Sequence, residues 1–330
     1  MLTTGDKLSG IWPDLPEPVS NNAVAAAEQD NRLIVFSLLG IGSSKLNDAI
    51  TNAAYMLDAM SGRWSILPAV PGLGRLASTA QCVAGRVYLF GGYTVNVQAA
   101  EHSLPNLDIY SISTRSWTRG SDIPIPVDDS VSGVYRNRYI YLISGWSESD
   151  NVELVQVYDT VTNIWQQATP IAGTPVFGHA GSIIGDQIIY CDGAYRSSNS
   201  FVASNGCWLG SIDSGDLTRI TWNRLAVHPG AARFRIAAGA DLGRGKVWFV
   251  GGTNNPYNYN GIGYNGEPSE PSPVVFSYDV SAREWQLLTN SGPASMDHRG
   301  LIVAHNALTT VGGMEGAQQV NAHVRSVMIR

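Results

Sequence analysis

Residues that can transfer protons or bind an anion recur shortly before short apolar segments of this 330-residue chain. Histidine and carboxylate side chains can transfer protons near neutral pH, and arginine can hold a carboxylate through two hydrogen bonds. The set comprises Asn22, Arg75, Asp128, Asp129, His179, Arg233, Arg235, His298 and Arg299. If the apolar segments surround a common axis, these side chains converge on it.

The apolar segments belong to an internal repeat. A run such as RVYLFGG (86–92) or KVWFVGG (246–252) ends in glycine, and a second apolar run then leads to tryptophan. Short β-branched segments bounded by glycine indicate strands, and a period near 50 residues is typical of propeller blades. The six tryptophans that end the units are Trp12, Trp64, Trp117, Trp165, Trp222 and Trp285.

The second run of each unit carries a further signature. LDIYSISTRSW ends at Trp117, VQVYDTVTNIW at Trp165 and VFSYDVSAREW at Trp285. Together with the glycine pairs, these residues resemble the kelch repeat over nearly the whole chain. The resemblance implies an all-β, six-bladed β-propeller of kelch type with four-stranded blades in a single domain, 1–330. The expected blades are 21–67, 75–120, 128–168, 176–225, 232–288, and 297–330 completed by an N-terminal strand, 8–12, that closes the ring.

Composition limits the class of partner and the compartment. The chain is 44% hydrophobic and 15% charged, with a formal charge of −6 and a pI near 5.5. Nucleic acids and anionic membranes attract basic surfaces, so neither is expected as the main partner. The start of the sequence lacks the pattern of a signal peptide. We therefore expect a cytoplasmic protein, or a periplasmic or secreted one if the chain is a processed form.

The three cysteines, Cys82, Cys191 and Cys207, show no paired metal-ligand spacing. Free buried thiols are the favoured interpretation. Cys191 and Cys207 flank one loop, which leaves a disulfide as the alternative in an oxidising compartment.

Alignment of the units on their strand-ending glycines places a set of residues at the mouth of the central channel. Function on a repeat scaffold resides in such loops and strand ends, because the blades are occupied in stacking. The aligned positions, within two residues, are Asn21, Arg75, Asp128, Phe177, Arg235 and Met296. A ring made only for packing would not gather this many charged neighbours.

A long loop, 253–273, adds a second layer of candidates. It contains Tyr257, Tyr259, Tyr264 and Glu267, and Trp146 occupies a shorter loop of the same kind. Aromatic rings can stack on sugar rings, and a loop of this length without regular structure is usually functional or disordered. These residues predict a sugar-binding mouth.

The compact six-unit form resembles the bacterial N-acetylneuraminate epimerases, or mutarotases. That resemblance implies an isomerase acting on an acidic sugar such as a sialic acid, without a cofactor. Arg75 and Arg235 would hold the sugar carboxylate. His298 or His179 would accept the anomeric proton, and Asp129 or Glu267 would protonate the ring oxygen. Small-molecule carbohydrate is then the expected partner, and the sequence leaves the oligomeric state open.

Two other classes of function stay open. His179 and His298 with Asp128 or Asp129 could hold a divalent metal, as two histidines and one carboxylate do for iron. A metal-dependent oxidase or lyase would follow. Alternatively, the chain is a non-catalytic module that binds a protein or sugar.

Overall fold

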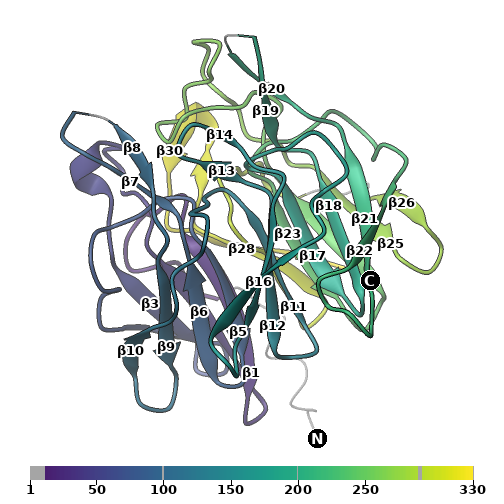
Figure 1. The fold of residues 1–330 in the computed structure, drawn as a ribbon. Helices are drawn as coiled ribbons and strands as arrows, with labels where there is room; N and C mark the ends of the chain where they lie inside the picture. Colours follow the sequence, from purple (N-terminus) through teal and green to yellow (C-terminus); the bar gives the residue numbers. More distant parts are fainter. Residues whose placement is uncertain (1–11, 99, 199, 289–291, 330) are drawn as a thin grey trace, which may run out of the picture.

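The computed structural model describes residues 12–98, 100–198, 200–288 and 292–329. It confirms the expected all-β propeller of six blades around an axis (Figure 1). Five blades have four antiparallel strands, and the described part of the sixth has three. No helix in the described ranges is long and apolar enough to cross a membrane.

The strands of each blade follow one another outward from the axis, in the order a, b, c and d. The first three blades are β1 (Ala23–Gln29), β2 (Arg32–Leu38), β3 (Ala54–Asp58) and β4 (Arg63–Ile66); β5 (Thr79–Val83), β6 (Arg86–Phe90), β9 (Leu107–Ser111) and β10 (Ser116–Arg119); and β11 (Val131–Tyr135), β12 (Tyr139–Ile143), β15 (Val155–Asp159) and β16 (Ile164–Ala168).

The other three blades have the same order. They are β17 (Ala180–Ile184), β18 (Gln187–Cys191), β21 (Cys207–Ile212) and β22 (Ile220–Arg224); β23 (Ala237–Asp241), β24 (Lys246–Val250), β25 (Val275–Asp279) and β26 (Glu284–Leu287); and β27 (Ile302–Ala304), β28 (Ala307–Val311) and β31 (Val324–Met328).

Small ribbons extend the loops between strands b and c. They are β7 (Tyr93–Val95) with β8 (Glu101–Ser103), β13 (Trp146–Ser147) with β14 (Asp150–Asn151), β19 (Ala194–Ser197) with β20 (Ser200–Ala203), and β29 (Met314–Glu315) with β30 (Gln319–Val320). Single 3-10 turns, η1 (Asn47–Ala49) and η2 (Gly316–Gln318), lie in two of these loops. The ribbons gather at the upper end of the molecule in Figure 1, which we call the ribbon face.

The repeated tryptophans join neighbouring blades. The indole N–H of Trp117 donates to the carbonyl of Pro68 at 2.8 Å, in the segment that leaves the preceding blade. Trp165 and Trp285 make the same bond to Ser121 and Ala226. The spacing that marks the repeat is thus the spacing of a contact between blades.

The ring closes through residues near the start of the chain. The expected closing strand 8–12 lies outside the described residues except for Trp12, which is buried in a cluster with residues of the first and last blades. Trp64 donates to the carbonyl of Pro13, and the N–H of Leu15 donates to the carbonyl of Ala322 at 2.7 Å. Pro13 therefore has the same relation to the first blade that Pro68 has to the second.

The cysteine prediction was wrong for two of the three thiols. Cys191 and Cys207 form a disulfide between β18 and β21, whereas Cys82 is free. Burial raises the pKa of the Cys82 thiol to about 12.

Candidate functional site

One residue from each blade reaches the axis in the same unusual conformation. Just before strand a, the backbone has a left-handed φ of 51° to 68°, a region that costs energy for most side chains. An isolated bridge to the start of the b–c loop fixes the preceding residue in every blade. The six residues, which we call the axial ring, are Asn21, Ala77, Asp129, Gly178, Arg235 and Asp297.

Backbone bonds link members of the axial ring from blade to blade. The N–H of Asp129 donates to the carbonyl of Ala77 at 3.0 Å, that of Gly178 to Asp129 at 2.9 Å, and that of Arg235 to Gly178 at 2.8 Å. Asn21 donates likewise to Asp297 at 3.3 Å. These bonds satisfy polar backbone groups beside the axis, and they hold the ring side chains in fixed places.

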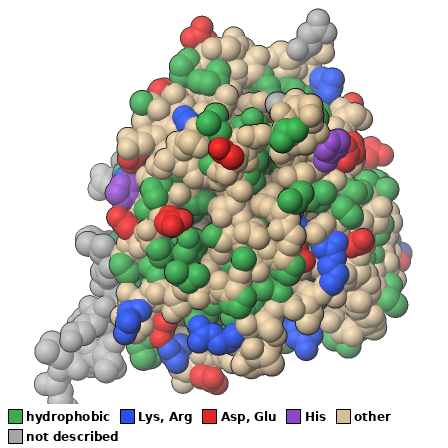
Figure 2. Space-filling model, turned by 90° about the vertical axis from the view of Figure 1, so that its left-hand side faces the viewer, with side chains coloured by type: hydrophobic (Ala, Val, Ile, Leu, Met, Phe, Trp, Pro, Cys, Tyr) green, Lys and Arg blue, Asp and Glu red, His purple; other side chains and the backbone are tan. Residues whose placement is uncertain are grey.

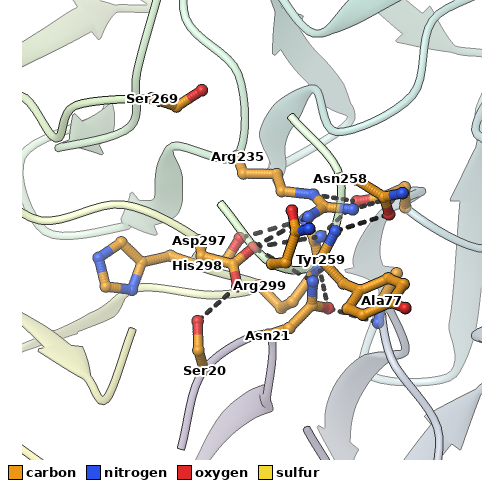
Figure 3. Close-up of polar contacts among 12 residues, drawn as sticks. Ser20, Asn21, Ala77, Arg235, Asn258, Tyr259, Ser269, Asp297, His298 and Arg299 are labelled. Carbon is orange, nitrogen blue, oxygen red and sulfur yellow. Dashed lines mark hydrogen bonds and ion pairs between the residues drawn. The ribbon is translucent and has the colours of Figure 1, made fainter. Parts of the chain in front are cut away.

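Arg235 lies at the centre of a buried ion cluster (Figure 3). Its Nη2 donates to Asp129 Oδ2 at 2.8 Å, and its Nη1 donates to Asp297 Oδ1 at 3.2 Å. Arg299 forms an ion pair with Asp129, and its Nε donates to Asn21 Oδ1 at 3.2 Å. The side chains of the four ionic residues are at most 5% exposed. Two arginines and two aspartates balance, so the cluster as a whole is neutral.

The pKa values follow from this arrangement. Burial favours a neutral Asp129, but the charges of Arg235 and Arg299 outweigh it and hold its pKa below the ordinary value. Burial likewise disfavours the Arg235 cation, yet Asp129 and Asp297 raise its pKa well above the ordinary value. Both groups are therefore charged at neutral pH, and Asp129 cannot serve as a proton donor there.

Acidic and phenolic groups cover the cluster on the ribbon face. Asp128 accepts from the hydroxyl of Ser103 at 2.6 Å, and burial together with the neighbouring Asp129 raises its pKa well above the ordinary value. Burial also raises the pKa of Tyr93, Glu101 and Tyr264, which all feel the charge of Arg235. Carboxyl groups with raised pKa values hold protons more readily than free ones, which is a common property of functional sites.

The loop 253–273 closes over this side. Tyr257 is fully buried, with the Arg235 guanidinium 5.1 Å from its ring centre. Tyr259 packs against the apolar group that includes Ala77 and Tyr93. Tyr264 packs on Phe201 with ring centres 4.6 Å apart. The loop's tyrosines are therefore fixed by packing.

Two histidines flank the cluster on its other side. The Nε2 of His179 lies 2.9 Å from the carbonyl oxygen of Ile143, and the Nε2 of His298 lies 2.9 Å from Ser295 Oγ. Burial lowers the pKa of both imidazoles to about 4, so both are neutral at pH 7. Since a carbonyl only accepts, Nε2 of His179 carries the proton and Nδ1 carries the lone pair. Within the described ranges, this Nδ1 has no hydrogen-bond partner.

An axial cavity of about 640 Å³ ends at these histidines. Ser130, His179, His298 and Arg299 line its inner end, and the inner strands of the blades form its wall. Exposed residues of the a–b turns, including Arg136, line its outer end. The cavity therefore opens at the end of the propeller opposite the ribbon face. Its volume lies in the range of about 300–1,000 Å³ that is typical of small-molecule sites.

The structure separates the candidates predicted from the sequence into three groups. Asp129, Arg235, Arg299 and Tyr257 meet in or beside the ion cluster, and His179 and His298 reach the cavity. Asp128, Tyr259, Tyr264 and Trp146 lie on the ribbon-face side, where Trp146 packs on Phe177 and Phe201. Glu267 is exposed in the loop 253–273.

The third group lies away from the cluster. Arg75 is buried in its own blade, where Nη2 donates to Asp108 Oδ2 of β9 at 2.7 Å. The backbone N–H of Arg233 donates to Asp192 at 2.9 Å. The amide of Asn22 donates to Ser37 Oγ at 2.8 Å and to the carbonyl of Val311, so it joins the first blade to the last.

Tyr93 and Ser130 were missed by sequence reasoning. Tyr93 comes directly after the glycine pair Gly91–Gly92, and Ser130 directly follows an axial-ring residue. Their places relative to the repeat could have indicated both, but neither residue type stands out in a single sequence.

Geometry compatible with a metal occurs at a different place from the one predicted. In the part of the chain that the structure describes, ligand atoms of Asp192, Cys207 and His228 lie within 4.8 Å of one another. No such group is found there for His179, His298 and the aspartates beside them.

Comparisons with known proteins agree with the repeat. Residues 9–193 match the family model described as the KLHDC2/KLHL20/DRC7 Kelch-repeats domain. The Kelch-like protein terF of Aspergillus terreus (strain NIH 2624 / FGSC A1156) is 26% identical over 193 residues, which are 56% of this chain and 41% of that protein. The putative F-box/kelch-repeat protein At3g46050 of Arabidopsis thaliana is 24% identical over 104 residues, 32% of this chain and 26% of that protein. The matches thus cover less than half the length of these curated relatives.

A solved structure entitled "Structure of YjhT" superposes with a TM-score of 0.78 at 16% identity, covering 97% of this chain and 98% of that one. This likeness concerns the fold. The family match covers more than half of the chain, and the described part of that range folds into blades of the propeller. The chain belongs to the kelch-repeat family.

Proposed function

We propose that this propeller is a carbohydrate isomerase that binds an acidic sugar in the axial cavity and interconverts its anomers. The observation that carries the proposal is the pair of neutral imidazoles, His179 and His298, beside Arg299 at the inner end of a cavity of about 640 Å³. The family and fold are compatible with this activity, and the cavity offers groups of the right kind for it.

Anomer exchange needs a base for the anomeric hydroxyl and a proton donor for the ring oxygen. In the proposal His179 is the base, because its Nδ1 lone pair is unpartnered among the described residues. His298 donates from Nδ1 when the hydroxyl of Ser295 donates to its Nε2. A bound carboxylate next to the imidazoles would raise their pKa towards neutrality, which improves both as proton-transfer groups.

The proposed anion-binding residue is Arg299. Its Nη2 pairs with Asp129, and its Nε and Nη1 donate to Asn21 and to the carbonyl of His298, which leaves the second N–H of Nη1 for a ligand. Arg75 and Arg235, expected from the sequence to hold the carboxylate, are already paired with buried aspartates. Freeing either would cost a buried aspartate one of its two arginine partners, because Asp108 also pairs with Arg119 and Asp129 with Arg299.

The test measures anomer exchange directly. Magnetisation transfer between the anomers of N-acetylneuraminate, and of glucuronate, is recorded by NMR with and without the protein. We expect the protein to accelerate exchange of an acidic sugar, and His179→Gln to reduce the acceleration about 100-fold, the lower end of the effect of a positioned base. Arg136→Gln is the matched control, because Arg136 lines only the outer end of the cavity.

Arg299→Lys separates anion binding from folding. It retains the positive charge of the cluster but loses the planar guanidinium and its bonds to Asn21 and His298, so weaker sugar binding is expected in a protein that still unfolds cooperatively. Folded wild-type protein that neither binds nor isomerises any acidic sugar would refute the proposal.

A binding module is the second candidate, and one observation favours it. On the ribbon face, Trp146, Phe201 and Tyr264 form a partly exposed aromatic group, and the Arg196 guanidinium lies 5.5 Å from the ring centres of Trp146 and Phe201. Aromatic and arginine side chains are enriched at binding hot spots. If a peptide or glycan array gives hits that Phe201→Ala abolishes while the cavity variants retain them, this second function is favoured. Figure 2 shows one side of the propeller, where hydrophobic side chains are interspersed with acidic and basic ones.

A further inference from the structure

The fourth blade departs from the repeat at a place remote from the functions proposed above. At the last cross-strand pair of strands b and c, the other blades have apolar partners: Leu38 with Ala54, Phe90 with Leu107, Ile143 with Val155, Val250 with Val275, and Val311 with Val324. The fourth blade has Cys191 opposite Cys207, and the two are disulfide-bonded. Apolar residues at this pair satisfy the packing in the other blades, so packing alone does not require two cysteines here.

Asp192 follows at a position that favours glycine. Its φ is 68°, and the residues at the same place in three other blades are Gly91, Gly251 and Gly312, with Leu39 and Ser144 in the remaining two. This left-handed conformation disfavours a residue with a side chain. The carboxylate is also fully buried. Asp192 therefore combines an unfavourable backbone conformation with an acidic side chain removed from water.

His228 completes the group from the segment that leaves the blade. In the second blade the corresponding contact with the glycine turn is made by the aliphatic Ile123. The imidazole is stacked on Phe276 at 4.3 Å between ring centres, and its Nε2 lies 2.9 Å from both Asp192 oxygens. Its Nδ1 lies 3.0 Å from the carbonyl oxygen of Pro229. In this arrangement Nε2 donates to the Asp192 carboxylate, and loss of that proton, with Nδ1–H held by the carbonyl, leaves a Nε2 lone pair that can bind a metal, as metal-ligating histidines commonly do.

We propose that, once the Cys191–Cys207 disulfide is reduced, these residues bind a divalent cation of the zinc class. Ligand atoms of Asp192, Cys207 and His228 lie within 4.8 Å of one another, and the sulfur of Cys191 is bonded to that of Cys207. Two thiolates, an imidazole and a carboxylate form a four-ligand set suited to tetrahedral zinc. The disulfide removes both thiolates, so oxidation closes the site.

The chemistry balances with a dithiol as the reductant. Two electrons and two protons pass from the dithiol to the disulfide, giving two thiols and an oxidised, cyclic disulfide of the reductant. Metal binding then releases the two thiol protons and the Nε2 proton of His228. The cation with two thiolates and one carboxylate carries a single negative charge. The Arg233 cation, whose charge acts on Asp192, offsets it.

Cobalt(II) is the probe for this site. The protein is reduced by a dithiol under mildly denaturing conditions, because both sulfurs are buried, and is then refolded without oxygen. One equivalent of cobalt should give a thiolate-to-cobalt absorption in the near ultraviolet and intense tetrahedral bands in the visible. Zinc should abolish both, and the disulfide form should show neither.

Variants assign the ligands. His228→Gln should weaken cobalt binding at least about tenfold, the loss that even an outer partner of a metal ligand can cause. Cys82→Ser is the matched control and should leave the spectrum unchanged, because Cys82 lies in β5 of another blade. If His228→Gln does not fold, Asp192→Asn provides the same comparison.

Refolded, reduced protein with titratable thiols that gives no thiolate–cobalt absorption would overturn the proposal. So would a spectrum that Cys207→Ser leaves intact. The proposal does not depend on the isomerase activity, which is assayed on the oxidised protein and involves none of these residues.

Discussion

The buried ion cluster predicts a large and pH-dependent loss of stability in Arg235→Met. Methionine has a similar length, but it leaves Asp129 and Asp297 without their shared cation. Removing one partner of a buried ion pair costs about 3–5 kcal/mol. Since unfolding entropy is about 2.1 cal/mol/K per residue, a 330-residue chain should then melt about 4–7 °C lower.

The pH dependence separates a charge effect from lost packing. In the variant Asp129 keeps only Arg299 as a cation partner, so its folded pKa lies above its wild-type value, and protonation relieves part of the cost of the substitution as the pH falls. In the wild type the folded pKa of Asp129 is lowered, so stability is lost as the pH falls through it. The stability difference between the two proteins should therefore narrow from pH 7 to pH 5.

Urea unfolding at several pH values measures this difference. Arg138→Met is the matched control, because Arg138 binds Asp159 through two hydrogen bonds but is partly exposed. It should cost less than about 1 kcal/mol. The double variant Arg235→Met with Asp129→Asn should recover part of the loss. A loss below about 1 kcal/mol, or a difference that does not change with pH, would refute the reasoning.

Three further predictions concern single contacts. Burial lowers the folded pKa of His179 and His298 to about 4, so their contribution to stability is complete above pH 6.5 and is lost as the pH falls towards 4. In a plot of melting temperature against pH, His298→Gln should therefore reduce the slope on the acid side. Trp12→Ala should cost about 3–5 kcal/mol in urea unfolding, since it empties a buried contact between the first and last blades, and an unchanged midpoint would contradict that closure. Arg75→Met should destabilise by about 3 kcal/mol because it leaves the buried Asp108 only the partly exposed Arg119 as a partner, with partial rescue by Asp108→Asn as the check.

The fold was predictable because its signals repeat. A glycine pair or a tryptophan means little alone, but six copies in the same order leave few architectures. The signals also have physical roles, since the N–H of Trp64, Trp117, Trp165 and Trp285 binds the segment before its blade and the glycines turn where a side chain would clash, whereas the buried N–H of Trp222 has no partner among the described residues. The closing strand was inferred by counting, and only its last residue falls within the described structure.

The site was less predictable because the repeat is not rigid in length. Gly40 follows Asn21 by 19 residues, whereas Gly92 follows Ala77 by 15. Counting back from the glycines therefore selected Arg75 where Ala77 occupies the axial ring, and Asp128 where Asp129 does. A shift of one residue turns a side chain to the other face of a strand. The left-handed φ that defines the ring leaves no single residue type as a marker, since Asn, Ala, Asp, Gly and Arg all occur there.

The axial ring has an evolutionary consequence. Its members are linked largely through backbone N–H and carbonyl groups, which are the same whatever side chain is attached. At Ala77 and Gly178 the axial-ring position has no polar side chain. At Asp129, Arg235 and Asp297 it has a charged one. The six axial-ring positions therefore accept different residue types around one axis. Single substitutions at these positions can change the charge and polarity at the axis during evolution, while the backbone bonds that hold the ring stay the same.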